Sequence, residues 1–160
     1  MMVSRLDIAG TDAELVVINV HLSAYDDGSM RTQEMAMLRE KMIEEYDKGN
    51  YVIVGGDFNQ TFPSAVGVYP VLSEDYYVAH NIPDDFLPDG FSYQIDNTVP
   101  TARLLNQPYD PTDPMTQYYI IDGFIVSDNI FVEEVFTVDA EFAYSDHNPV
   151  MLRVQLKGDE

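Results

Sequence analysis

A carboxylate and an amide follow a short apolar run in the middle of the chain. Residues 51–54 read as a buried strand, and Gly55-Gly56 permits a tight turn or a close approach of the backbone. Asp57 and Asn59 follow, and in extended backbone such side chains point the same way. The strand would thus deliver an acid and an amide to one sheet edge, a place suited to catalysis or metal binding. An Asx turn accounts for the same residues.

Two histidines stand near the ends of other apolar runs. His21 closes residues 15–22, and Asn19 shares its face of that strand. A histidine in such a place is more often a satisfied core group than a catalyst. His147 stands at the mouth of the final strand, and Asp122 interrupts another apolar run. A carboxylate within reach of an imidazole fixes its tautomer and raises its basicity, although a structural ion pair is the alternative for Asp122.

A strand–helix–strand unit is predicted to position these groups. Residues 15–22 and 51–54 are the strands, and residues 30–48 between them carry apolar side chains at helical spacing. A crossover of this kind makes the two strands parallel neighbours. His21 and Asp57 are therefore expected at the same edge of the sheet.

The rest of the chain is predicted to hold more strands and one long irregular segment. The further strands are residues 3–8, 118–126, 130–138 and 150–156. Residues 61–114 are rich in Pro, Asp, Tyr and Asn, with short elements expected near 69–72, 76–80, 91–93 and 102–105. A long segment of this kind is often a binding loop, so the stretch from Tyr69 to Tyr119 is predicted to set specificity. His80 is interpreted as a surface residue. Arg31 either reaches back to the acidic site or lies in solvent.

Composition excludes several classes of protein. With 46% hydrophobic residues in 160, the chain can build a core, and without cysteine it has no disulfide, thiolate metal site or cysteine nucleophile. The net charge of −20, from 28 acidic and 8 basic residues, disfavours electrostatic binding along a nucleic-acid backbone. The same charge suits the binding of cations. No membrane-spanning run or signal peptide is visible in the sequence.

Four motifs in this order resemble the endonuclease/exonuclease/phosphatase superfamily, which includes deoxyribonuclease I, abasic-site endonucleases, neutral sphingomyelinases and inositol polyphosphate phosphatases. The motifs are Asn19-x-His21-Leu22, Gly56-Asp57-Phe58-Asn59, Ile121-Asp122-Gly123-Phe124 and Ser145-Asp146-His147. The likeness is greatest to bacterial members, many of which carry an N-terminal membrane anchor. An extracytoplasmic or membrane-anchored location is accordingly expected, with membrane contact only through an anchor that this sequence lacks.

The resemblance implies an α/β fold, specifically the C-terminal half of a four-layer α/β/β/α sandwich with mixed, largely antiparallel sheets. Residues 1–160 would be a single partial domain. The family's first half supplies a metal-binding Glu in a Gln-Glu pair at a strand end, whereas Gln33-Glu34 lies in the predicted helix. The isolated piece is therefore expected to be inactive or impaired, and to associate with a missing N-terminal half or with itself.

The implied activity is hydrolysis of a phosphate ester, assisted by Mg²⁺ or Mn²⁺. By resemblance, the catalytic residues are His21, Asp57, Asn59, Asp122 and His147. Asp57 would orient or deprotonate the water, Asn59 would hold the nucleophile or a phosphate oxygen, and His147 would stabilise transition-state charge. Asp122 would fix the imidazole of His147, and His21 would be a second phosphate contact.

The resemblance also assigns residues around the metal. Asp146 and Asp57 are expected at the metal or its water shell, and Asn19 and Ser145 are expected to support the site without touching substrate. Two other interpretations remain open. One is a non-catalytic acidic binding or assembly module. The other is an acidic calcium-binding module built from Asp26, Asp27, Asp110 and Asp113.

Overall fold

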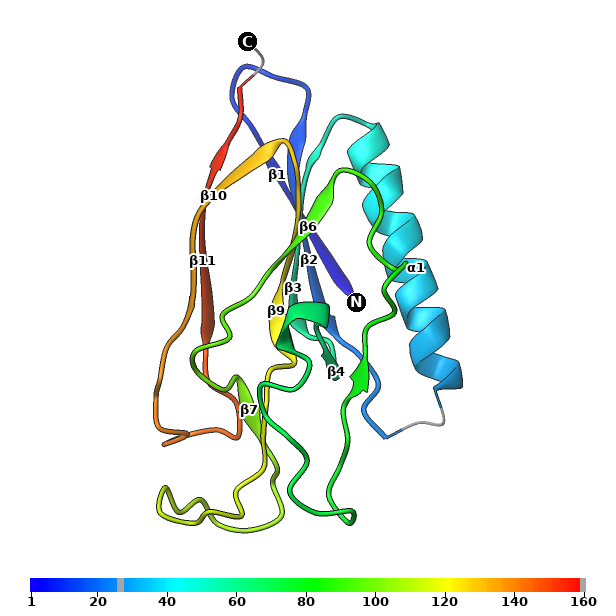
Figure 1. The fold of residues 1–160 in the computed structure, drawn as a ribbon. Helices are drawn as coiled ribbons and strands as arrows, with labels where there is room; N and C mark the ends of the chain where they lie inside the picture. The colour runs from blue at the N-terminus through cyan, green and yellow to red at the C-terminus, as the bar shows by residue number, and fades with distance from the viewer. Residues whose placement is uncertain (26–27, 159–160) are drawn as a thin grey trace.

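The computed structural model describes residues 1–25 and 28–158, and its centre is a five-stranded mixed sheet in the order β1-β2-β3-β9-β6 (Figure 1). The elements of this sheet and its crossover helix are β1 (Met2–Asp7), β2 (Glu14–His21), α1 (Ser29–Asp47), β3 (Tyr51–Asp57), β6 (Phe91–Gln94) and β9 (Asp122–Ser127). The remaining elements are β4 (Gln60–Thr61), η1 (Pro63–Ala65), β5 (His80–Asn81), β7 (Ala102–Arg103), β8 (Tyr118–Tyr119), β10 (Ile130–Thr137) and β11 (Val150–Leu156).

The predicted crossover is confirmed. Strands β2 and β3 pair in parallel, from Leu15 opposite Tyr51 to His21 opposite Asp57. Helix α1 covers one face of the sheet, and its buried side chains include Met35, Leu38 and Met42. They join the even-numbered side chains of β2 and those of β3 in one core, because alternate residues of a strand face the same side.

A hairpin of β10 and β11 lies on the other face of the sheet, opposite α1 (Figure 1). A second core lies between them and includes Ile53, Val126, Ile130 and Leu152. Most of the strand pairs are antiparallel, and β2–β3 and the short β4–β5 pair are parallel. The α/β class with mixed, largely antiparallel sheets is thus confirmed, while the four-layer sandwich and the partial domain stay predictions.

Glycine is required where β3 approaches β2. Gly56 has a φ of 138°, and a Cβ built on it would lie 2.0 Å from the carbonyl oxygen of Val20. A side chain at this position would displace one of the two strands. Strand β3 therefore runs through both glycines to Asp57, further than the predicted 51–54.

The predicted strand over residues 118–126 is wrong, because the chain changes sheets within it. Strand β8 pairs with β7, whereas β9 pairs with β3 and β6. At the break, the backbone N–H groups of Ile121 and Asp122 donate to the buried Oγ1 of Thr101, at 3.0 and 3.1 Å. Asp122 accordingly opens a strand instead of interrupting one.

The segment between β3 and β8 has little regular structure, as predicted. Its short elements differ from the expected ones at the start, where η1 and β5 form instead of elements at 69–72 and 76–80. Strands β6 and β7 lie at the expected places near 91–93 and 102–105.

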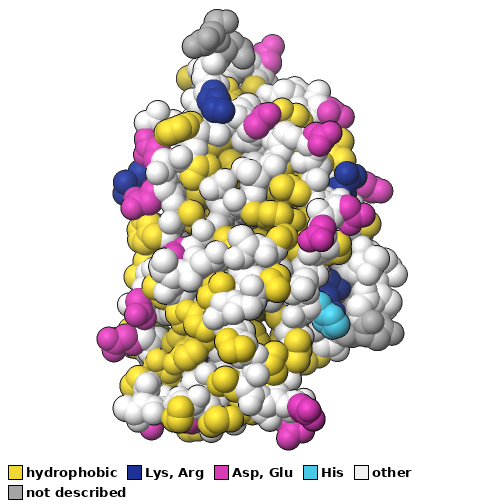
Figure 2. All heavy atoms as spheres, in the orientation of Figure 1, with side chains coloured by type: hydrophobic (Ala, Val, Ile, Leu, Met, Phe, Trp, Pro, Cys, Tyr) yellow, Lys and Arg dark blue, Asp and Glu magenta, His cyan; other side chains and the backbone are white. Residues whose placement is uncertain are grey.

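Acidic side chains are dispersed over the face seen in Figure 2, while apolar side chains gather in its lower half, where Figure 1 shows loops. Asp110 and Asp113, two residues of the calcium interpretation, accept hydrogen bonds in their own turns, from Thr112 and Met115. Asp26 and Asp27, the other two, lie outside the described residues. None of the described helices is long and apolar enough to span a membrane.

Candidate active site

Three of the predicted catalytic residues end or begin neighbouring strands of the central sheet. His21 ends β2 and lies opposite Asp57, which ends β3. Asp57 in turn lies opposite Asp122, the first residue of the antiparallel strand β9. Strand register alone therefore brings two carboxylates and an imidazole to one edge, as the sequence predicted for His21 and Asp57.

Asp57 and Asn59 form one hydrogen-bonded unit. Asp57 Oδ1 accepts the backbone N–H of Asn59 at 2.7 Å, and Oδ2 accepts its side-chain amide at 3.1 Å. That amide also donates to the carbonyl of Leu22 at 2.7 Å, which ties the turn to the end of β2. Asn59 is buried and has a φ of 48°. The Asx turn thus exists, and it holds the carboxylate in place at the sheet edge.

Two imidazoles flank the carboxylate of Asp57. His147 Nδ1 lies 2.9 Å from Asp122 Oδ2, as a hydrogen bond, and its Nε2 faces Asp57 Oδ2 at 3.9 Å. His21 Nε2 lies 3.6 Å from the same Asp57 oxygen. The two histidines differ in exposure, at 78% for the His21 side chain and 33% for His147. His147 is therefore fixed, and His21 reaches into solvent.

The electrostatics of the site follow from these contacts. Burial raises the pKa of Asp57, and repulsion from the charge of Asp122 raises it further. The hydrogen bond from the backbone N–H of Asn59 lowers this pKa, but the net shift is upward. The hydrogen bond to Asp122 raises the pKa of His147 to about 9, although burial opposes it. At neutral pH, His147 is accordingly an imidazolium between two carboxylates.

The backbone around His147 is held by residues that the sequence did not reveal. Thr101 is completely buried; its carbonyl accepts the N–H of Asn148, and its hydroxyl accepts the N–H of Asp122. It therefore positions both members of the Asp122–His147 pair from one place. Ala102 next to it forms a β-bridge with His147. No periodicity marks Thr101 in the sequence, because it lies in an irregular segment.

A cavity of about 330 Å³ opens onto these groups, and its lining includes His21, Asp57, Asn59, Asp146 and His147. The irregular segment supplies Tyr77 and Arg103 to the remaining wall, and β8 supplies Tyr119. Tyr25 completes an aromatic side, since its ring lies edge-on to that of Tyr77 with centroids 5.0 Å apart. Tyr25 and Arg103 were not predicted site residues.

The remaining predicted residues lie at the margin. Ser145 Oγ accepts the backbone N–H of His147 at 3.1 Å. Asp146 lines the cavity, and its carbonyl accepts the N–H of Arg103. Asn19 is exposed on β2 opposite Gly55, and no hydrogen bond joins it to His21 among the described residues. The roles of these three residues stay predictions.

The donor atoms suit a divalent cation. Among the described residues, Asp57, Asp122 and, when its imidazole is neutral, His147 each offer one ligand atom, all within 4.8 Å of one another. Two carboxylates that repel each other in a half-buried place are stabilised by a cation, and Mg²⁺ and Mn²⁺ prefer oxygen ligands. Asp146 is not in this group, so its predicted contact with the metal is not part of the observed cluster.

Solved structures with the same fold exist. The chain superposes on D. rerio TDP2 complexed with a single-strand DNA product at a TM-score of 0.62 and 15% identity, over 96% of this chain and 60% of that chain. The chain has the endonuclease/exonuclease/phosphatase fold. This fold is also seen in the Bacteroides thetaiotaomicron mannosyl-6-phosphatase Bt3783, with a TM-score of 0.52 and 18% identity, over 91% of this chain and 53% of that chain.

A Bacteroides thetaiotaomicron protein of the endonuclease/exonuclease/phosphatase family matches similarly, at a TM-score of 0.52 and 18% identity, over 94% of this chain and 54% of that chain. The chain thus spans about half to three fifths of these solved chains. No protein-family model and no curated protein matches the sequence. The endonuclease/exonuclease/phosphatase fold is accordingly established by structure.

Proposed function

We propose that the chain is a phosphate-ester hydrolase that works with a divalent cation, Mg²⁺ or Mn²⁺. The observation that carries this proposal is Asp57 at the sheet edge, flanked by two imidazoles and paired by register with Asp122. Similarity of fold to TDP2 and to a mannosyl-6-phosphatase supports the same reaction class. The carboxylates of Asp57 and Asp122 would hold the cation, which would supply charge neutralisation at the phosphate.

Each protein group has a role that its contacts support. The raised pKa of Asp57 suits a carboxylate that orients a water and accepts its proton. His147, kept as an imidazolium by Asp122, would donate a hydrogen bond to a non-bridging phosphate oxygen and stabilise its charge. His21 is exposed in the cavity and would contact the leaving-group side of the phosphate.

The substrate class is narrowed by the cavity and the charge. A net charge of −20 disfavours extended nucleic acid, so the preferred substrate would be small or would present one accessible phosphate. Arg103 is a cation on the cavity wall, and the Tyr25–Tyr77 pair offers an aromatic face for a ring or sugar beside the phosphate. The predicted specificity role of the segment from Tyr69 to Tyr119 fits its share of that wall.

Hydrolysis of bis(p-nitrophenyl) phosphate and p-nitrophenyl phosphate with Mg²⁺ or Mn²⁺ tests the proposal. We expect release of nitrophenol that chelator abolishes and that Asp57→Asn lowers by at least about a hundredfold. Asp12→Asn, in the exposed turn between β1 and β2, is the matched control and should keep full activity. A folded protein without metal-dependent turnover would contradict the proposal for this chain by itself, and would favour either the predicted impairment of the isolated piece or a non-catalytic binding module.

A further inference from the structure

The loop after β2 carries an exposed aromatic ring at the candidate active site. Tyr25 is 84% exposed, and it lines the same cavity as His21 and Asp57. A side chain this exposed buries little apolar surface in the fold, so packing of the core does not account for its position. The ring is therefore accessible to a molecule that occupies the cavity.

Hydrogen bonds anchor the loop that leads to this ring. The N–H of Leu22 donates to the carbonyl of Asp57 at 2.9 Å, and the carbonyl of Leu22 accepts the side-chain amide of Asn59. Ser23 donates to the carboxylate of Glu34 through its N–H at 2.9 Å and through its hydroxyl at 3.1 Å. The loop is thus fixed both to the candidate site and to α1.

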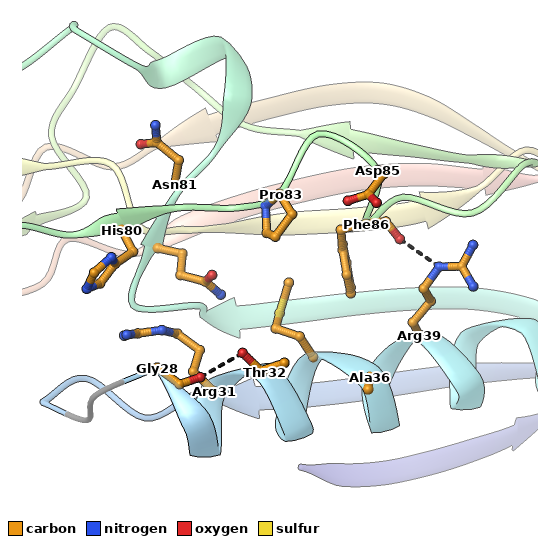
Figure 3. A pocket seen from close by; sticks show the side chains of 12 residues that line it. Gly28, Arg31, Thr32, Ala36, Arg39, His80, Asn81, Pro83, Asp85 and Phe86 are labelled. Carbon is orange, nitrogen blue, oxygen red and sulfur yellow. Dashed lines mark hydrogen bonds between the residues drawn. The ribbon is translucent and has the colours of Figure 1, made fainter.

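The first turn of α1 holds the same loop. Arg31 is buried and donates to the carbonyls of Ser23 and Ala24, at 3.0 and 3.1 Å. Figure 3 shows the Arg31 side chain extending toward the N-terminal end of the helix. The sequence predicted that Arg31 reaches either the acidic site or solvent, and both alternatives are wrong. It contacts the backbone of the loop that carries Tyr25.

Two further tyrosines continue the aromatic wall next to Tyr25. Its ring centroid lies 5.0 Å from that of Tyr77, which lies 6.0 Å from that of Tyr119, and all three residues line the cavity. The hydroxyl of Tyr77 is within hydrogen-bond distance of the carbonyls of Ala24 and Asn59, at 3.3 and 3.2 Å. Tyr77 therefore ties the loop to the turn of the candidate site.

The residues that line the cavity fall into two chemical groups. Carboxylates, an amide and imidazoles form one group, and the three tyrosines form the other, with Leu105 as an apolar neighbour. The hydroxyl of Tyr119 donates to a backbone carbonyl at 2.7 Å, and Arg103 donates to two carbonyls of its own segment. The second group thus offers ring faces more than hydrogen bonds, which favours an aromatic ring over a sugar.

We propose that Tyr25 is a specificity-determining residue of the candidate active site, which selects phosphate esters whose alcohol part carries a flat aromatic ring. This inference rests on the proposed hydrolase function and narrows its substrate class. With the phosphate at Asp57 and His147, the ring of the alcohol part packs against the exposed ring of Tyr25. Stacking of one aromatic ring on a tyrosine changes affinity by about tenfold.

Three phosphonates, which have no ester bond to hydrolyse, test this inference apart from turnover. Benzylphosphonate, cyclohexylmethylphosphonate and methylphosphonate share the anionic group and carry a flat ring, a puckered ring and no ring. In titration calorimetry with Mg²⁺ or Mn²⁺, we expect benzylphosphonate to bind at least about tenfold more tightly than methylphosphonate, and more tightly than the cyclohexyl compound. No binding of benzylphosphonate, or binding equal to that of either comparison compound, would overturn the inference.

Variants of exposed tyrosines locate the contact. Tyr25→Ala should reduce the preference for benzylphosphonate over methylphosphonate by about tenfold, whereas Tyr25→Phe should keep it, because the ring face remains. Tyr144→Ala is the matched control, since Tyr144 is fully exposed and lies outside the cavity lining, and it should also keep the preference. A preference that survives in Tyr25→Ala would refute the assignment.

Turnover separates this inference from the proposed function. Tyr25→Ala should lower kcat/KM for phenyl phosphate about tenfold more than for glycerol 2-phosphate, and comparison with the wild type cancels the different reactivity of the two esters. Equal losses for both esters would overturn the role of Tyr25 and leave the hydrolase function standing. A chain that prefers benzylphosphonate through Tyr25 but hydrolyses neither ester would support the ring contact and contradict the hydrolase function.

Discussion

The Asp122–His147 hydrogen bond, 2.9 Å long, decides the charge of the candidate site. It raises the pKa of His147 to about 9 from an ordinary value of 6.5. Because the folded-state pKa is the higher one, this pair stabilises the fold fully below pH 6.5 and loses its contribution as pH rises through about 9. The imidazolium is therefore present across the physiological range.

Removal of the carboxylate partner should reverse this shift. In Asp122→Asn, we expect the pKa of His147 to fall toward 6.5, since the largest cause of its rise is gone. An NMR titration of the imidazole protons in chelator checks this without metal. His21, which has no contact with Asp122 among the described ion pairs, is the internal control. A His147 signal that still titrates near pH 9 in the variant would disprove the assignment.

Gly56 gives a second prediction at the level of a single residue. Gly56→Ala should destabilise the fold by roughly 3–5 kcal/mol, because its Cβ meets the Val20 carbonyl and its φ is positive. Gly10→Ala is the matched control, with a φ of 90° but open space around it, and should cost about 1–2 kcal/mol. Urea unfolding measures both, and equal losses would show that backbone strain alone matters.

Among the secondary-structure elements, α1 is fastened to β1 through one buried carboxylate. The Glu45 side chain is fully buried, and Arg5 of β1 contacts it at 2.6 Å. Lys41 of the helix, and Lys48 and Asn50 just beyond its end, bind the same carboxylate. Burial alone would raise the pKa of Glu45, but these four donors outweigh it and lower the pKa.

A lower pH should therefore weaken the attachment of α1 to β1. Because the folded-state pKa of Glu45 is lowered, its stabilisation is complete above about pH 4.5, its ordinary value, and is lost as pH falls through the folded value. Glu45→Gln should cost about 2–3 kcal/mol at pH 7 and make the decline of stability below pH 4.5 shallower. Glu44→Gln, on the exposed side, should cost little. If the free energy of unfolding fell equally steeply below pH 4.5 in Glu45→Gln and in the wild type, this account would be contradicted.

The elements also show how far the sequence could be interpreted. The crossover from β2 to β3 was predictable, because helical and strand periodicities alternate cleanly there, and with it came the meeting of His21 and Asp57. The break in the strand before Asp122 was not predictable, because residues 118–126 are apolar throughout except for that aspartate. What breaks the strand is the hydroxyl of Thr101, a contact across about twenty residues that no local pattern records. Asp146 and Asn19 were predictable as neighbours of the site, but not their exact contacts.

For the whole molecule, the dominant property is its charge of −20. Like charges dispersed over a surface repel one another and oppose compaction, and salt screens this repulsion over about 10 Å at 0.1 M. We expect the melting temperature to rise by a few degrees between low and physiological NaCl. Calorimetry at constant pH measures it, with chelator present so that bound divalent ions do not contribute. A melting temperature that falls with salt would mean that attractive ion pairs dominate.

The apolar surface is a second property of the whole molecule. Exposed apolar side chains lie on the β10–β11 hairpin and at its ends, namely Phe131, Phe136, Val138 and Met151. Self-association stays a prediction from the sequence, as do the impaired activity of the piece and its membrane-anchored location.

The residues of the candidate site are far apart in the chain, at positions 21, 57, 122 and 147. They meet through the register of β2, β3 and β9, the bridge from Ala102 to His147 and the hydrogen bonds of Thr101. Contacts of such long range form late in folding, since a large loop must close before each one can stabilise the chain. During synthesis, His147 also emerges after every other member of the set. In a nascent or partly refolded chain, local structure such as α1 is therefore expected to form before these four residues come together in the candidate site.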